Sequence, residues 1–145
     1  MGGTALTVGS SANGTFSGAI YDDTTPGSVR KVGSGTQTLS GTNTYGGSTL
    51  ITGGALLVNG THTGGGLYTV ASGATLGGTG SIGSNLLISA DGAIAPGASV
   101  GTLTVMGSID LEGILKPKFL LIETTKGFIG KAVAFSSVFR VLATD

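Results

Sequence analysis

The sequence predicts an all-β protein, a parallel β-helix (β-solenoid), and three observations carry this prediction. Glycine supplies 29 of the 145 residues and proline only 3, so turns are frequent and the collagen pattern is excluded. Short runs rich in Val, Ile, Leu and Thr separate the glycines, and the mean hydropathy is +0.41, which is opposite to the composition of disordered chains. Large apolar residues also recur at intervals of six positions over much of the chain.

The six-residue interval is even, so it keeps these residues on one face of extended segments. Stacked turns of short strands would then bury the face in a narrow core, with turns of about 18–20 residues and roughly seven to eight turns in all. The interval alone leaves the handedness open. The predicted core positions are Leu39, Tyr45, Ile51, Leu57, Val70, Leu76, Ile82, Ile88, Ile94, Val100, Val105 and Leu111.

Glycine and Asn pairs between the strands predict the corners of the turns, where a positive φ is needed or a Cβ would clash. The pairs are GG at 46–47, 53–54 and 77–78, NG at 59–60 and DG at 91–92.

The chain divides into a repeat region, 1–113, and a glycine-poor C-terminal segment, 114–145. The last 32 residues contain only two glycines but five of the chain's seven Lys and Arg residues. Its apolar stretch KAVAFSSVFRVLA is typical of an extended strand. Such a strand would either cap the open end of the solenoid or pair with the edge of a neighbouring molecule.

Charge and cysteine content exclude several classes of function. The formal net charge is zero, so no global field favours nucleic acid or an anionic membrane. The absence of cysteine rules out disulfides, thiol catalysis and cysteine-ligated zinc. The sequence shows no signal peptide and no run long enough to span a membrane.

One motif resembles a nucleotide-binding fingerprint. TLGGTGSIGSN contains G-x-G-x-x-G at Gly78, Gly80 and Gly83. That fingerprint needs a following helix and an acidic residue about 20 positions on, whereas Asp91 lies closer and the next segment has no helical pattern. Ile82 within the motif is also a predicted core residue, so we interpret the glycines as corners of the repeat.

Acidic residues offer two weak candidates for chemistry. Asp110 and Glu112 share one face of a predicted strand, as the paired carboxylates of a hydrolase or lyase could. Solvated outward side chains are the simpler interpretation. Asp22 and Asp23 fit a turn, and the calcium-binding nonapeptide that would make them metal ligands is missing.

The remaining polar candidates are isolated. His62 is the only histidine, lies in a glycine-rich stretch and lacks partners for a triad or a metal site. Arg30 and Lys31 form one small basic spot, too little for nucleic acid. We therefore predict no enzyme activity, with no catalytic, cofactor-binding or metal-binding residues and no cofactor.

The segment 33–60, GSGTQTLSGTNTYGGSTLITGGALLVNG, resembles the autotransporter-associated β-strand repeat, also called the passenger-associated transport repeat. The residues that carry the likeness are Gly33, Gly35, Thr36, Leu39, Gly41, Asn43, Thr44, Tyr45, Gly47, Thr49, Ile51, Gly54, Leu56 and Val58. Flanking segments extend it over about 6–113. The resemblance implies a right-handed β-helix in an extracellular or surface-exposed region of a bacterial passenger, without catalytic residues.

The predicted function is a non-catalytic structural module, a β-helical stalk or display scaffold. One alternative is a subunit that self-assembles end to end, or by strand addition, into an extracellular filament, so the expected partner is the chain itself. The other is a β-helix that binds glycans or degrades polysaccharides. The sequence offers few residues for binding or cleaving a glycan, because the segment 33–109 holds one charged residue, Asp91, and two tyrosines, Tyr45 and Tyr68.

Overall fold

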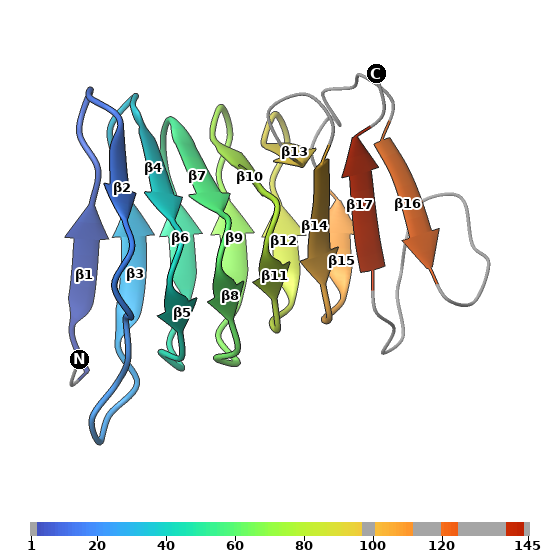
Figure 1. The fold of residues 1–145 in the computed structure, drawn as a ribbon. Coiled ribbons are helices and arrows are strands. Elements are labelled where there is room, and N and C mark those ends of the chain that lie inside the picture. The colour runs from blue at the N-terminus through green and yellow to red at the C-terminus, as the bar shows by residue number, and fades with distance from the viewer. Residues whose placement is uncertain (1–2, 97–100, 112–119, 125–138, 144–145) are drawn as a thin grey trace.

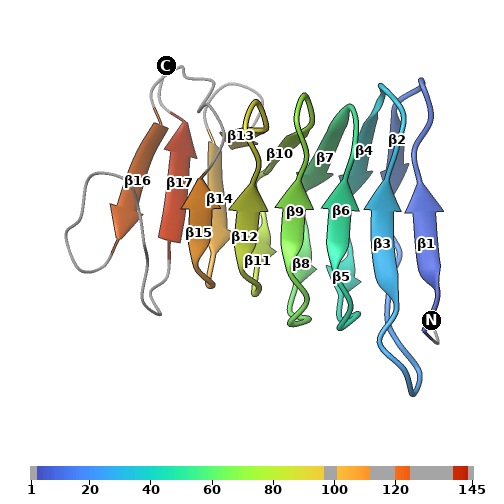
Figure 2. The ribbon, with the colours of Figure 1, turned by 180° about the vertical axis from the view of Figure 1, so that it is seen from behind.

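The computed structural model describes residues 3–96, 101–111, 120–124 and 139–143, with the last two ranges described for the backbone alone. The chain winds about five times into a β-solenoid, and its successive turns stack in a row (Figure 1). The same row is seen from behind in Figure 2, with β1 at one end and β16 and β17 at the other. The predicted β-solenoid fold is confirmed.

Three sheets form the sides of the solenoid. The first six-stranded sheet, sheet A, consists of β1 (Ala5–Val8), β3 (Ser28–Lys31), β6 (Thr49–Ile51), β9 (Tyr68–Val70), β12 (Leu86–Ile88) and β15 (Ile109–Leu111). The five-stranded sheet B consists of β2 (Gly14–Phe16), β4 (Thr36–Leu39), β7 (Ala55–Val58), β10 (Thr75–Gly78) and β13 (Ala93–Pro96). The second six-stranded sheet, sheet C, consists of β5 (Thr42–Asn43), β8 (Thr61–His62), β11 (Ser81–Ile82), β14 (Gly101–Val105), β17 (Phe139–Ala143) and β16 (Leu120–Thr124).

The turns differ in length. We number them from one to five by their strands in sheet A, starting with β1, β3, β6, β9 and β12. Parallel pairing in sheet A aligns Leu6, Val29, Thr49, Tyr68, Leu86 and Ile109 in one column. The spacings within this column are 23, 20, 19, 18 and 23 residues. The prediction of seven to eight turns was therefore wrong, because the first and fifth turns carry long corners and the C-terminal strands leave the parallel pattern.

Side chains that point inward form columns along the solenoid axis. In sheet A one column runs Val8, Lys31, Ile51, Val70, Ile88 and Leu111. In sheet C another runs Asn43, His62, Ile82 and Val105. The apolar members of these columns belong to the continuous hydrophobic core or pack against it, so burial of successive turns on one another stabilises the fold.

One predicted core position is wrong. Leu56 and Val58 are fully buried in β7, whereas Leu57 is only half-buried. The strand therefore faces the core one residue out of step with the six-residue interval, and a shift by one residue reverses the side-chain faces. Val100 lies outside the described residues, and Leu111 packs on the core only in part. The remaining predicted positions are buried.

The glycine corners have a steric cause. A Cβ on Gly80 would overlap the carbonyl oxygen of Gly60, one on Gly60 that of Gly41, and one on Gly41 that of Gly18. These glycines form a column at the corner between sheets B and C, where successive turns approach through their backbones. The predicted corner at 91–92 is also present, since Asp91 has a φ of 62°.

The C-terminal strands change the direction of pairing. Strand β17 pairs antiparallel with β14, the last parallel strand of sheet C, and β16 pairs antiparallel with β17. Most of the apolar stretch KAVAFSSVFRVLA, residues 131–143, lies outside the described residues. The division at residue 113 and the two roles considered for the last segment stay predictions. Across the described residues the structure has no helix that is long and apolar enough to cross a membrane.

Candidate functional site

The most concentrated polar chemistry of the solenoid is a buried cluster of Tyr45, Thr49, His62 and Tyr68. Tyr68 and Thr49 lie in adjacent strands of sheet A, His62 lies in β8 of sheet C, and Tyr45 follows β5. The Tyr45 hydroxyl lies 2.7 Å from Thr49 Oγ1 and 3.2 Å from the Tyr68 hydroxyl. Burial raises the pKa of Tyr45 and raises that of Tyr68 still further, so both phenols stay protonated at neutral pH.

His62 lies at the edge of this cluster, with only 1% of its surface exposed. Its ring stacks on Tyr45 with a centroid distance of 4.1 Å and lies 5.3 Å from the ring of Tyr68. Nε2 is 2.9 Å from the backbone oxygen of Tyr45, an acceptor, so Nε2 carries the proton. Nδ1 is buried and has no hydrogen-bond partner. Burial lowers the pKa of His62, and the ring is neutral at pH 7.

From the sequence we considered partners of His62 only for a triad or a metal site, and the structure adds a backbone acceptor and two aromatic neighbours. His62 is an inward member of a column between Asn43 and Ile82. Packing against the two tyrosine rings holds the imidazole in place, and its Nε2 donates a hydrogen bond to the backbone. The negative charge of Asp22 acts on the ring and opposes the lowering of the His62 pKa by burial.

Lys31 is the second buried polar group, and its side chain has no exposed surface. Nζ donates hydrogen bonds to the backbone oxygens of Val32, Gly33 and Gly53 at 2.8, 3.1 and 3.0 Å. The ammonium thus joins the corner of turn two to that of turn three, although burial lowers its pKa. The predicted basic spot at Arg30 and Lys31 was wrong, because alternation along β3 exposes Arg30 and buries Lys31.

Other polar side chains also link neighbouring turns. Asp22 accepts hydrogen bonds from the N–H groups of Gly46 and Gly27, at 2.6 and 2.9 Å, and the bond from Gly46 is the main reason its pKa is lowered. Asn43 Oδ1 accepts the N–H of Ile20, and Asn85 Oδ1 that of Ser108. The acidic and amide groups therefore serve the stacking of turns.

The G-x-G-x-x-G glycines lie at the end of one strand, in the following turn and just after the next strand. Gly78 ends β10 with a φ of 115°, Gly80 belongs to the corner column, and Gly83 follows β11. The next described element is strand β12, where a nucleotide site would need a helix. The interpretation as a repeat corner is confirmed for Gly80.

The acidic candidates are described only in part. Asp110 is exposed on β15, and Glu112 lies outside the described residues. Asp23 is exposed beside Asp22. Within the part of the chain that the structure describes, no three His, Cys, Asp or Glu side chains gather closely enough to hold a metal ion.

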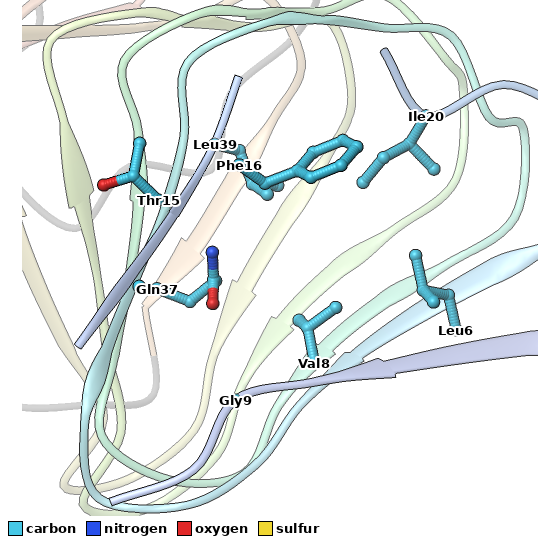
Figure 3. Close-up of a pocket in the computed structure, with 9 residues that line it drawn as sticks. Leu6, Val8, Gly9, Thr15, Phe16, Ile20, Gln37 and Leu39 are labelled. Atoms are coloured by element: carbon cyan, nitrogen blue, oxygen red, sulfur yellow. The ribbon is translucent and has the colours of Figure 1, made fainter. Parts of the chain in front are cut away.

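A hollow of about 400 Å³ opens at the first turn (Figure 3). Its lining is mainly apolar and includes Leu6, Val8, Phe16, Ile20 and Leu39, with Gln37 as a polar member. Gly14 pairs with Gln37, and a Cβ on Gly14 would lie 2.9 Å from Gln37 Oε1, so the Gln37 amide occupies the place of a side chain there. Leu6 and Phe16 are 36% and 43% exposed, so the core is open to solvent at this end.

Comparison with known proteins gives one match. The family model of the passenger-associated-transport-repeat matches residues 29–58. These residues run from β3 to β7 and include Lys31, Asn43, Tyr45 and Thr49. No curated protein and no solved structure matches the chain. The resemblance stated from the sequence is thus confirmed, over residues 29–58.

Proposed function

We propose that this chain is a non-catalytic structural segment of a bacterial surface protein, a spacer that holds other parts away from the cell. The passenger-associated-transport-repeat match carries this proposal, because that family implies a secreted or surface-exposed protein. The match lies on stacked solenoid turns, which are units of structure.

The construction of the turns supports a spacer. Each turn adds about 4.8 Å along the axis, the spacing between neighbouring strands. The polar groups that are buried, including Lys31 and His62, bond to the protein's own backbone. Removing a turn would therefore change the length of the segment without removing a reactive centre.

A turn deletion tests this proposal. The chain would be placed between an epitope and an outer-membrane anchor in a bacterial host, and surface exposure of the epitope measured on intact cells. Deleting residues 68–85 removes one turn in register, since Tyr68 pairs with Leu86. We expect display with and without this turn. Loss of display on deletion, with the shortened chain still folded, would contradict a spacer.

Enzyme activity is tested separately, with a panel of polysaccharides and detection of released reducing ends. The proposal expects no turnover, and turnover that disappears on substitution of Asp110 would contradict it. Glycan binding stays a prediction. Where side chains are described, the large exposed aromatic residues are Phe16 and Tyr21, both in turn one, and a glycan array would test whether they bind sugar.

A further inference from the structure

His62 occupies a place in the core where a second proton finds no acceptor. It lies in β8 between Asn43 of turn two and Ile82 of turn four, and its ring is stacked on Tyr45. Nε2 donates a hydrogen bond to the backbone oxygen of Tyr45, whereas Nδ1 is buried without a hydrogen-bond partner. Protonation would therefore place at Nδ1 an N–H group and a positive charge that the folded turn leaves unpaired.

The uncharged polar groups around the ring already bond to other atoms. The Tyr45 hydroxyl bonds with the hydroxyls of Thr49 and Tyr68, and Asn43 Oδ1 accepts the N–H of Ile20. Both tyrosines stay neutral at pH 7, because burial raises their pKa. The imidazolium would thus meet no anionic phenolate in the cluster.

Among the described residues, Asp22 is the charged group that acts on the ring. Its negative charge favours the protonated imidazole and opposes burial, which has the larger effect on the His62 pKa. Its two carboxylate oxygens accept hydrogen bonds from the N–H groups of Gly27 and Gly46. Asp22 therefore makes protonation less unfavourable, but it does not bond to Nδ1.

The segment after His62 is suited to local opening. Residues 63–66, TGGG, lead from β8 of sheet C to sheet A, and consecutive glycines leave the backbone many conformations. A Cβ on Gly65 would meet no atom within 4 Å, so there is open space beside this corner. Segments of this kind, with few packed side chains, open at a lower free energy than core strands.

We propose that His62 is an acid-sensitive switch, and that on protonation its ring leaves the core and the corner 62–66 opens while the neighbouring turns stay stacked. In the open corner both ring nitrogens donate to water. The aromatic rings of Tyr45 and Tyr68, which contact the imidazole in the closed state, become accessible. The change is confined to one corner, and so differs from unfolding of the whole chain.

Amide hydrogen exchange of the full chain, followed by NMR between about pH 7 and 5, tests this switch above the range where carboxylates titrate. Protection factors remove the intrinsic pH dependence of exchange. The amides of Thr63 and Gly83 report the opening, because they donate to the backbone oxygens of Asn43 and His62. We expect their protection factors to fall by up to about tenfold per pH unit below about 6.5.

An amide on the other side of the same turns is the internal control. Ala71 donates to the oxygen of Ile51 and so joins turns three and four, as Gly83 and His62 do. Its protection factor should stay constant over this pH range. Opening of a whole turn or of the whole chain would lower the protection of Ala71 together with that of Gly83.

His62→Phe is the matched variant, because it keeps an aromatic ring against Tyr45 and cannot titrate. The protection factors of Thr63 and Gly83 should then be independent of pH. The ring signals of His62 give a second measurement that needs no variant, since the chain has no other histidine. In the unmodified chain we expect ring protonation and the loss of protection at Thr63 and Gly83 to follow the same pH curve.

Four results would overturn the proposal. They are constant protection at Thr63 and Gly83, an equal fall at Ala71, the same fall in His62→Phe, and ring protonation that leaves the protection factors unchanged. The switch does not depend on the spacer function, so the display assay and hydrogen exchange can fail independently.

Discussion

The interiors of turns two and three differ from those of turns four and five, although the backbone path is the same. Turns two and three bury Lys31, Asn43, Thr49 and His62. Turns four and five bury mainly aliphatic side chains at the corresponding positions. They are Leu76, Ile82, Leu86, Ile88, Ile94, Leu103 and Val105.

Single columns show the change directly. In sheet C, Asn43 and His62 are followed by Ile82 and Val105. In sheet A, Lys31 is followed by Ile51, Val70 and Ile88. The fold therefore depends on the regular spacing of inward-facing positions and not on an apolar side chain at each of them. A polar side chain can occupy such a position where backbone atoms of a nearby corner form hydrogen bonds with it.

The largest effect is expected for a charge in the apolar half. Ile82→Asp would bury a carboxylate among aliphatic side chains without a partner, and should destabilise folding by on the order of 3–5 kcal/mol. Ser81→Asp is the control, because Ser81 is the outward neighbour in β11. Urea denaturation measures both. Equal stability of the two variants would contradict the assignment of Ile82 to the core.

The next effect concerns the corner column, which both halves share. Gly60→Ala would push a Cβ into the carbonyl oxygen of Gly41, and overpacking of this kind costs about 1–3 kcal/mol. Gly65→Ala is the control, since a Cβ there meets no atom within 4 Å. Thermal unfolding should separate them clearly. A Gly60→Ala protein as stable as Gly65→Ala would mean that the turns are not stacked this closely.

Lys31→Met tests the polar interior of turns two and three by placing there an apolar side chain, as in turns four and five. The three carbonyl oxygens of Val32, Gly33 and Gly53 would lose their donor. We expect a loss of about 1.5–3 kcal/mol, as for hydrogen bonds to charged groups. Arg30→Met, on the exposed face of the same strand, should change stability little. A gain in stability for Lys31→Met would show that the hydrogen bonds of Lys31 to the corner carbonyl oxygens do not stabilise the fold.

A smaller, pH-dependent effect is expected at His62. Because burial lowers its folded-state pKa, the unfolded chain binds a proton first as pH falls below about 6.5. Stability should therefore be full above that value and fall by up to about 1.4 kcal/mol per pH unit below it, until the folded-state pKa is reached.

His62→Phe keeps an aromatic ring against Tyr45 and removes the titration. Its stability should be independent of pH between about 6.5 and 5, above the range where the carboxylates titrate. The lowered pKa of Asp22 acts only at lower pH, as that carboxylate loses its bonds from Gly46 and Gly27. Denaturant midpoints at several pH values give the comparison. An identical decline in the variant would rule out His62 as its source.

Much of the fold could be predicted from the sequence, because glycine corners and evenly spaced apolar residues both follow from stacking. Tyr45, Leu76 and Ile82 were placed correctly on that basis. Leu57 was not, since the six-residue interval cannot detect a one-residue change of face when Leu56, Leu57 and Val58 are all apolar. The predicted number of turns was too high, because the six-residue interval gives no sign of the longer corners.

The polar interior was harder to predict. Lys31 and His62 belong to residue types that are usually exposed or isolated, and their partners are backbone oxygens of other turns. The signal that could have revealed them is position. Lys31 and Ile51 are 20 residues apart in one column, and His62 and Ile82 likewise. The spacing of turns, once known, would have placed both side chains inside.

The central claim is the register in which successive turns stack. Nuclear Overhauser contacts between side chains of adjacent turns test it most directly. The structure predicts contacts of Leu56 with Leu76, of the Lys31 methylene groups with Ile51, and of His62 with Ile82. Contacts that place Leu57 in the core beside Leu76, with Leu56 exposed to solvent, would contradict the register.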